Sequence, residues 1–263
     1  MSNTSVRTIL TRVFVACGAF VLLLTTAVAA QGFDHYKKQV VDYGAPKDFP
    51  ANPHHDVLTC FYYRGLMVKQ FSNEWNKGAL FLSFLRFDHA QPPCVKEHSP
   101  EEQVLDRTEW SGYFGAGVKG ALVFFDASDG ENGGMPFAVY DSKTKKKIFE
   151  DNAYSSWMWN PKLRPRPSPF NDLRVRTTND GNVVLTYLRV VATECDIPNN
   201  GAECWPQIVQ KLGLKTAATP RCIRWEENQI YGASAVAYPV ETSLFPTPVT
   251  KTISGPVRCW PVD

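Results

Sequence analysis

The chain has 263 residues, of which 44% are hydrophobic and 21% are charged. These proportions are ordinary for a globular protein, and they exclude a disordered chain, a collagen and a coiled coil. The 28 Lys and Arg residues nearly balance the 26 Asp and Glu residues, so the composition predicts no basic face for nucleic acid.

Residues 1–30 have the features of a secretory signal peptide. Arg7 and Arg12 are the only charged residues before residue 31, and an uncharged run from Val13 to Ala30 follows them. Small residues close this run, so we predict cleavage after Ala29 or Ala30 and export to the periplasm or the extracellular space. An uncleaved anchor is the alternative, because the run has the minimum length of a spanning helix. Cleavage would remove two Arg, leave a formal charge of zero and end any stable membrane insertion.

Residues 31–56 are rich in proline, aspartate and histidine, and we expect an extended arm there on a single domain spanning residues 57–263. Runs of aromatic and branched residues predict strands. These strands are expected within residues 58–68, 79–87, 121–125, 137–140, 147–149, 173–177, 183–191, 223–240 and 257–260. Two hairpins are predicted, one across residues 141–144 and one across residues 179–182, where Asp-Gly lies at the centre.

Two short helices are predicted. Ser99-Pro100-Glu101-Glu102 has an N-cap serine, a proline at the first position and a glutamate at the third, which indicates a helix ending near Arg107. A second helix is predicted over residues 206–214, with Gly213 near its end. Short strands with little helix between them favour a mostly β sandwich or jelly roll, and a β-propeller is the alternative.

Six cysteines remain after the predicted cleavage, and an even number in an exported chain indicates disulfides. We predict pairing in sequence order, although six cysteines permit other arrangements: Cys60–Cys94, Cys195–Cys204 and Cys222–Cys259. The middle pair is favoured because residues 196–201 have the composition of a turn. A zinc site is disfavoured, since no Cys-x-x-Cys spacing occurs.

Residues 115–120 match the dinucleotide-binding pattern of three glycines, Gly115, Gly117 and Gly120. That motif should open a helix, whereas here it precedes the predicted strand at residues 121–125. We therefore interpret these glycines as turn or bulge residues.

An acidic loop spans residues 126–134 and has three interpretations. Its composition favours a solvated turn. The first alternative is a Ca²⁺ site, since Asp126, Asp129, Glu131 and Asn132 offer oxygen ligands. The second is a catalytic pair of Asp126 and Glu131 acting on glycans or another extracellular polymer.

The five histidines all lie between residues 35 and 98: His35, His54, His55, His89 and His98. Three have an adjacent aspartate, a pattern that suggests a Zn²⁺ or Cu²⁺ site. Neighbouring residues of a strand point to opposite faces, however, so histidines on the surface are the preferred interpretation.

Tryptophan and basic residues suggest two further surfaces. Trp157 and Trp159 would share one face of an extended chain and could stack on a sugar, although most such rings lie in cores. The basic proline-rich loop of residues 160–170 could contact an acidic partner, although a solvated loop is favoured.

These observations favour an exported, non-catalytic binding or structural domain of unknown ligand, for which a glycan or a protein is a candidate partner. A hydrolase using the acidic loop is the second hypothesis, and a histidine-based metal-handling protein is the third.

Overall fold

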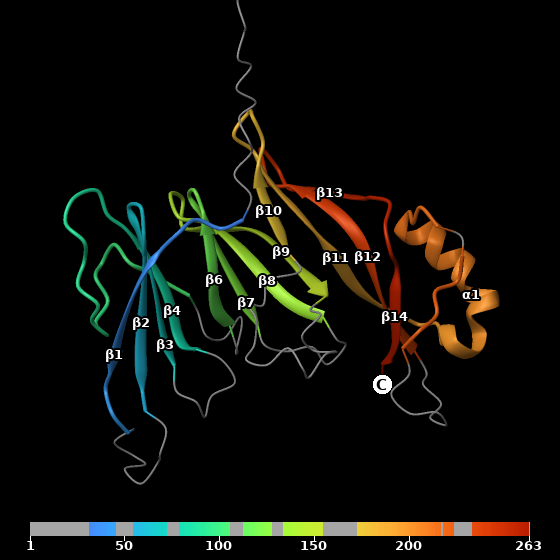
Figure 1. The fold of residues 1–263 in the computed structure, drawn as a ribbon, viewed down its shortest axis with the longest axis horizontal. Helices are drawn as coiled ribbons and strands as arrows, with labels where there is room; N and C mark the ends of the chain where they lie inside the picture. The colour runs from blue at the N-terminus through green and yellow to red at the C-terminus, as the bar shows by residue number, and fades with distance from the viewer. Residues whose placement is uncertain are drawn as a thin grey trace, which may run out of the picture.

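The computed structural model describes residues 32–45, 55–72, 79–105, 113–127, 134–154, 173–216, 218–223 and 233–262. The chain is mostly β, and its strands form two antiparallel sheets that do not close into a barrel (Figure 1). This arrangement confirms the predicted fold class. It is not the propeller considered as the alternative, since there are two sheets rather than blades around a channel.

The smaller sheet is a meander in which each strand pairs with the next along the chain. Its strands are β1 (Lys37–Asp42), β2 (Val57–Tyr63), β3 (Leu66–Ser72), β4 (Ala79–Arg86) and β5 (Gln103–Val104). The run at residues 58–68 is a hairpin rather than one strand. Gly65, at φ +70°, allows the turn between β2 and β3. The predicted N-terminal arm contains β1, which pairs with β2 and forms one edge of this sheet.

The larger sheet has nine strands in the order β13-β12-β11-β9-β8-β7-β6, with β10 beside β11 and β14 beside β12. Its first strands are β6 (Tyr113–Lys119), β7 (Leu122–Ala127), β8 (Gly134–Asp141) and β9 (Lys146–Tyr154). The remaining strands are β10 (Arg174–Thr177), β11 (Val183–Thr193), β12 (Ala233–Ser243), β13 (Val249–Thr252) and β14 (Arg258–Val262). Both predicted hairpins are confirmed, and Gly181 adopts φ +81° in the Asp-Gly turn.

Apolar residues from both sheets form the core between them. Val68 and Phe84 of the smaller sheet pack with Val123, Phe125 and Tyr140 of the larger one. Because side chains alternate along a strand, Leu122 and Phe124 face the opposite side, where they join a second cluster. That cluster includes residues of α1 (Ile197–Leu212), which lies beside β14 at one end of the larger sheet (Figure 1).

Of the two predicted helices, the first is not present in the described residues and the second is present but longer than predicted. Residues 99–102 form a turn, in which the Glu102 N–H bonds to the Ser99 carbonyl, and the chain continues as β5. The carboxylate of Glu102 reaches back to the Ser99 N–H as in a helix cap, but it also bonds to the neighbouring sheet. The helix expected at residues 206–214 begins nine residues earlier, at Ile197. The predicted turn at residues 196–201 therefore lies mostly in the first turns of α1.

The cysteines pair as predicted: Cys60–Cys94, Cys195–Cys204 and Cys222–Cys259, with Cα–Cα distances of 5.9, 6.0 and 4.5 Å. Three disulfides are typical of an oxidising, exported environment. Within the described ranges, no helix is both long enough and apolar enough to cross a membrane.

Candidate functional site

Several of the predicted site residues lie outside the described part of the chain. They are Asp129, Glu131 and Asn132 of the acidic loop, Trp157 and Trp159, the proline-rich loop of residues 160–170, His54, and the whole of residues 1–30. The calcium, catalytic-acid, glycan-stacking and signal-peptide hypotheses built on them therefore stay predictions.

Asp126 is the candidate ligand of the acidic loop that the structure describes, and it lies near the end of β7 with no exposed surface. It shares a sheet face with Phe124, and it lies opposite Phe137 of β8, which in turn lies opposite Asp151 of β9. Two carboxylates thus occupy one face, separated by two strand spacings, or about 10 Å. Asp151 accepts hydrogen bonds from the Tyr187 hydroxyl and from Nε of Arg189, at 2.9 Å.

The network around Asp151 is partly buried, and its members satisfy one another. Burial, followed by the charge of Asp151, raises the pKa of Tyr187 above its ordinary value, so its hydroxyl stays protonated and donates to the carboxylate. The Tyr187 hydroxyl also lies 3.4 Å from the hydroxyl of Thr242. This arrangement joins β9, β11 and β12 on one face of the larger sheet. It is a structural network, since Asp151 is already committed to an arginine and a tyrosine.

The described histidines contact few other groups. His35 and His89 are exposed, Nδ1 of His55 lies 2.8 Å from the Asp42 carboxylate, and Nδ1 of His98 lies 2.8 Å from the Glu102 carboxylate. Over the ranges that the structure describes, no three His, Cys, Asp or Glu side chains are placed to hold a metal ion together. His54 is not among them, so the metal hypothesis gains no support and stays a prediction.

The glycine motif at residues 115–120 has the structural role that its context predicts. Gly115 and Gly117 flank a register shift between β6 and β7, and Gly120 forms the turn between these strands at φ +61°. The Gly120 N–H donates to the carboxylate of Asp34. A side chain at Gly117 would collide with the ring of Phe33, so this glycine allows Phe33 and Asp34 to lie along β6.

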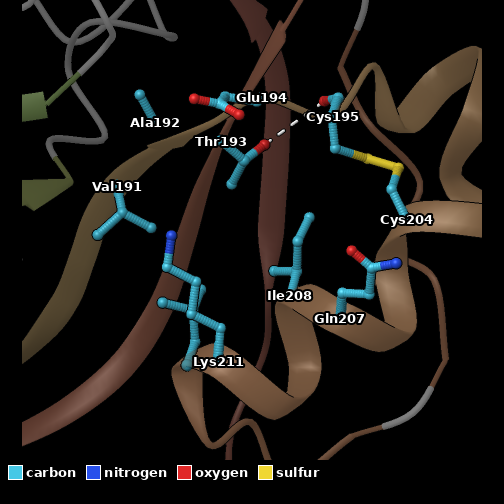
Figure 2. Close-up of a pocket in the computed structure, with 10 residues that line it drawn as sticks. Val191, Ala192, Thr193, Glu194, Cys195, Cys204, Gln207, Ile208 and Lys211 are labelled. Atoms are coloured by element: carbon cyan, nitrogen blue, oxygen red, sulfur yellow. Dashed lines mark hydrogen bonds between the residues drawn. A yellow bond between two sulfur atoms is a disulfide. The ribbon is translucent and has the colours of Figure 1, made fainter.

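A pocket of about 550 Å³ lies between the end of β11 and helix α1 (Figure 2). Its apolar wall consists of Val191, Ala192, Ile208 and Leu212. The polar lining consists of Thr193, Glu194, Gln207 and Lys211, and the Cys195–Cys204 disulfide completes the wall. The volume falls within the range of small-ligand sites, which combine apolar walls with a few polar groups.

Both ends of α1 are fixed to strands of the larger sheet, which gives the pocket a defined shape. At the N-terminus, the Ile197 N–H donates to the Ser234 hydroxyl at 3.1 Å. At the C-terminus, the Thr252 hydroxyl donates to the Leu212 carbonyl at 2.9 Å, before Gly213 ends the helix at φ +61°. These bonds satisfy helix-end groups that have no partner within a helix. The buried indole of Trp205 anchors the middle of α1 in the core.

Two opposite charges line the pocket without being paired to each other. In Figure 2 the ammonium group of Lys211 extends from α1 toward Val191, whereas Glu194 lies at the other side, next to Thr193. No ion pair or hydrogen bond ties either charged group to another residue of the described ranges. Both of these residues are exposed to solvent.

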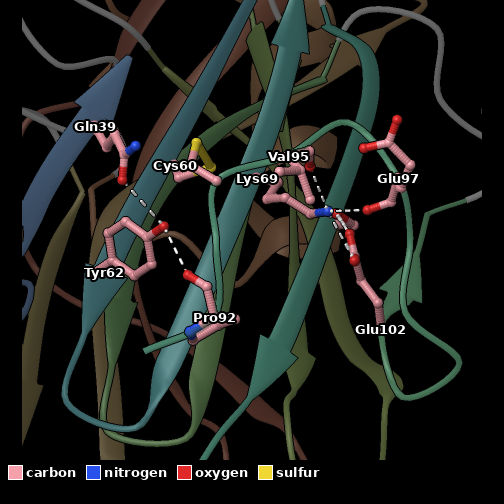
Figure 3. Close-up of a disulfide and its surroundings, with 10 residues drawn as sticks. Gln39, Cys60, Tyr62, Lys69, Pro92, Val95, Glu97 and Glu102 are labelled. Atoms are coloured by element: carbon pink, nitrogen blue, oxygen red, sulfur yellow. Dashed lines mark hydrogen bonds and ion pairs between the residues drawn. A yellow bond between two sulfur atoms is a disulfide. The ribbon is translucent and has the colours of Figure 1, made fainter. Parts of the chain in front are cut away.

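A second cluster of charged side chains holds residues 88–102, which we call the strap, against the outer face of the smaller sheet (Figure 3). Nζ of Lys69 lies 2.9 Å from the Glu102 carboxylate and donates to the carbonyls of Val95 and Glu97. The Ser83 hydroxyl also donates to Glu102. The side chains of Lys69 and Glu102 are only 2% and 1% exposed, so this cluster is structural rather than a binding site.

The sequence alone indicated neither the pocket nor the strap. The pocket residues have no motif spacing, and they come together because the second half of α1 packs beside the end of β11. Pro198 in the first turn of the helix was the available signal, since proline is favoured there. The chain matches no protein-family model, no curated protein and no solved structure.

Proposed function

We propose that the protein is an exported, non-catalytic binding domain that holds a small zwitterion with an apolar body in the pocket between β11 and α1. Export would use residues 1–30 as a signal peptide, and the three disulfides support an oxidising destination. A short apolar peptide is an example of such a ligand.

The observation that carries the proposal is the pair of uncommitted charges in one pocket. Lys211 can bind a carboxylate, Glu194 can bind an ammonium group, and the wall formed by Val191 and Ile208 can cover apolar side chains. A ligand with one charge would leave the other side of the pocket without a partner. A zwitterion satisfies both sides.

The test uses the full chain, expressed with its own N-terminus for export and purified in the oxidised form. Intact mass measurement should show loss of residues 1–29 or 1–30. Calorimetry would then compare the dipeptide leucyl-leucine with its C-terminal amide, which lacks the carboxylate, and with its N-acetyl derivative, which lacks the ammonium group. We expect each derivative to bind about tenfold or more weakly than the parent, because each loses one charged hydrogen bond.

Two substitutions assign the charges to the two ends of the ligand. Lys211→Met should weaken leucyl-leucine about tenfold or more without changing the affinity of the amide. Glu194→Gln should have the same effect on the parent without changing that of the N-acetyl derivative. Matched controls are Lys215→Met and Glu203→Gln, which change exposed residues of the same types outside the pocket lining. The proposal fails if leucyl-leucine does not bind, or if the pocket variants behave like the controls.

A further inference from the structure

Strand β1 forms an open edge of the smaller sheet, and it differs from the edges that β5, β6, β13 and β14 form. Natural proteins blunt such edges with short strands, proline, bulges or covering segments. Strand β5 has two residues, β13 has four, and β14 contains Pro261. Strand β6 has a bulge, and the Asp34 N–H bonds to its Val118 carbonyl. Strand β1 has six residues without proline or a register shift in its pairing with β2, and Val40 at its centre is 53% exposed.

The backbone groups that point outward from β1 belong to its even-numbered residues. The Tyr43 N–H donates to the Asp56 carbonyl, which lies on the β2 side, and Val41 lies opposite Leu58. Because alternate residues of a strand direct their N–H and C=O groups to opposite edges, Lys38, Val40 and Asp42 direct theirs away from β2. These three residues can therefore pair with another strand without disturbing the ladder between β1 and β2.

The side chains of the same three residues are complementary to a second copy of themselves. In an antiparallel pair around a two-fold axis at Val40, each Val40 lies opposite the other, and each Lys38 lies opposite the Asp42 of the second copy. All of these side chains lie on one face, since their positions differ by even numbers. The neighbouring register centred on Gln39 would instead place Lys38 opposite Val40. Charge complementarity therefore selects the register centred on Val40.

Asp42 has room for this additional partner. One carboxylate oxygen accepts the Gly44 N–H at 2.8 Å, and the other lies 2.8 Å from Nδ1 of His55. The side chain is still 56% exposed. A carboxylate has about four acceptor positions, so a lysine from a second copy can be added without displacing either neighbour.

We infer that two copies of this protein associate through antiparallel pairing of β1 with β1, with Lys38 of each copy paired to Asp42 of the other. The interface extends the smaller sheets of the two copies into one continuous sheet. This association is independent of the pocket at α1, because that pocket lies on the larger sheet.

Sedimentation velocity on the exported, oxidised full chain would test the pairing between about 5 and about 500 µM, a range suited to a small interface. We expect a reversible dimer. Lys38→Asp and Asp42→Lys should each weaken it about tenfold or more, because both opposite-charge pairs become like-charge pairs. An equimolar mixture of the two variants should restore it, since every pair in the mixed dimer again has opposite charges.

Two further variants separate pairing from general effects of charge and folding. Lys37→Asp makes the same change in charge on the other face of β1, and it should alter the affinity by less than about threefold. Val40→Pro removes an outward N–H while leaving the ladder with β2 intact, so it should give a monomer. Its unfolding midpoint should equal that of the unaltered chain at a concentration where both are monomeric. A monomer at every concentration, a dimer that resists Lys38→Asp, equal disruption by Lys37→Asp, or a mixture that does not associate would each overturn the proposal.

Discussion

The strap lies against the smaller sheet and helix α1 lies against the larger one, but the polar backbone groups of the two segments find their hydrogen-bond partners in different ways. Each covers the side of a sheet, and each is fixed by a disulfide, Cys60–Cys94 for the strap and Cys195–Cys204 for the helix. The helix satisfies its internal backbone groups with its own hydrogen bonds. The hydroxyl groups of Ser234 and Thr252 bond to its two ends, and Trp205 packs in the apolar core. The strap has no regular structure, and Lys69 of the sheet supplies donors to its carbonyls.

The difference shows where buried charge is needed in this fold. An irregular segment on an apolar face exposes carbonyls to a site that water cannot reach, and each such group costs free energy if it has no partner. A lysine ammonium group can satisfy two carbonyls at once, but it then needs a counter-charge. Glu102 provides that charge from the end of the strap itself.

Removal of Glu102 should have the largest effect on stability. Glu102→Ala leaves the ammonium group of Lys69 buried without its counter-charge, and we expect a loss of about 3–5 kcal/mol in the free energy of unfolding. Urea denaturation of the oxidised protein would measure it. The control is Lys147→Ala, which breaks the exposed pair with Glu150 and should cost about 0.5 kcal/mol or less. Equal effects of the two substitutions would show that the strap does not depend on its buried charges.

The sequence could predict the elements whose signals are local. The Asp-Gly hairpin, the alternating strands and the Cys195–Cys204 pair needed no knowledge of distant residues, whereas the other two cysteine pairs were chosen only by their order in the sequence. The role of Glu102 could not be predicted from local sequence. Its carboxylate does contact the Ser99 N–H as the capping pattern predicts, but it also bonds to Lys69 and Ser83, which lie on other strands. The pocket is also non-local, since Glu194 and Lys211 line one cavity only because α1 packs beside the end of β11.

The two disulfides should differ in their contributions because they close loops of different length. The pair Cys60–Cys94 spans 34 residues, whereas Cys195–Cys204 spans nine. Chain entropy predicts a loss of about 4 kcal/mol when the first is replaced by two alanines and about 3 kcal/mol for the second. Thermal unfolding of both double variants would measure the difference. A larger loss for the helix disulfide would mean that loop length does not govern these contributions.

The hydroxyl groups at the ends of α1 should contribute less than either disulfide. Thr252→Val keeps the shape of the side chain but removes the donor to the Leu212 carbonyl, so we expect a loss of about 1–2 kcal/mol. Thr250→Val is the matched control in the same strand. It removes a hydroxyl bonded to Thr242 rather than to the helix, so it should leave exchange of the α1 amides unchanged. Hydrogen exchange that increases at the end of α1 only in Thr252→Val would confirm that this hydroxyl fixes the helix.

We expect acid to detach the strap from the smaller sheet at a higher pH than it unfolds helix α1, and this change should be the most gradual of these effects. Burial raises the pKa of Glu102, but hydrogen bonds from Ser83, Lys69 and His98 outweigh burial and hold that pKa below its ordinary value. The carboxylate therefore stabilises the fold fully above its unfolded pKa of about 4.5, and this contribution is lost as the pH falls through the lower folded value.

Pepsin digestion at a series of pH values below 4.5, with the cleavage sites mapped by mass spectrometry, should cut within residues 88–102 before it cuts α1. Glu102→Gln should weaken this pH dependence, because a neutral amide has no proton to gain. First cleavage in α1, or an unchanged pH dependence in the variant, would place the acid sensitivity outside the strap.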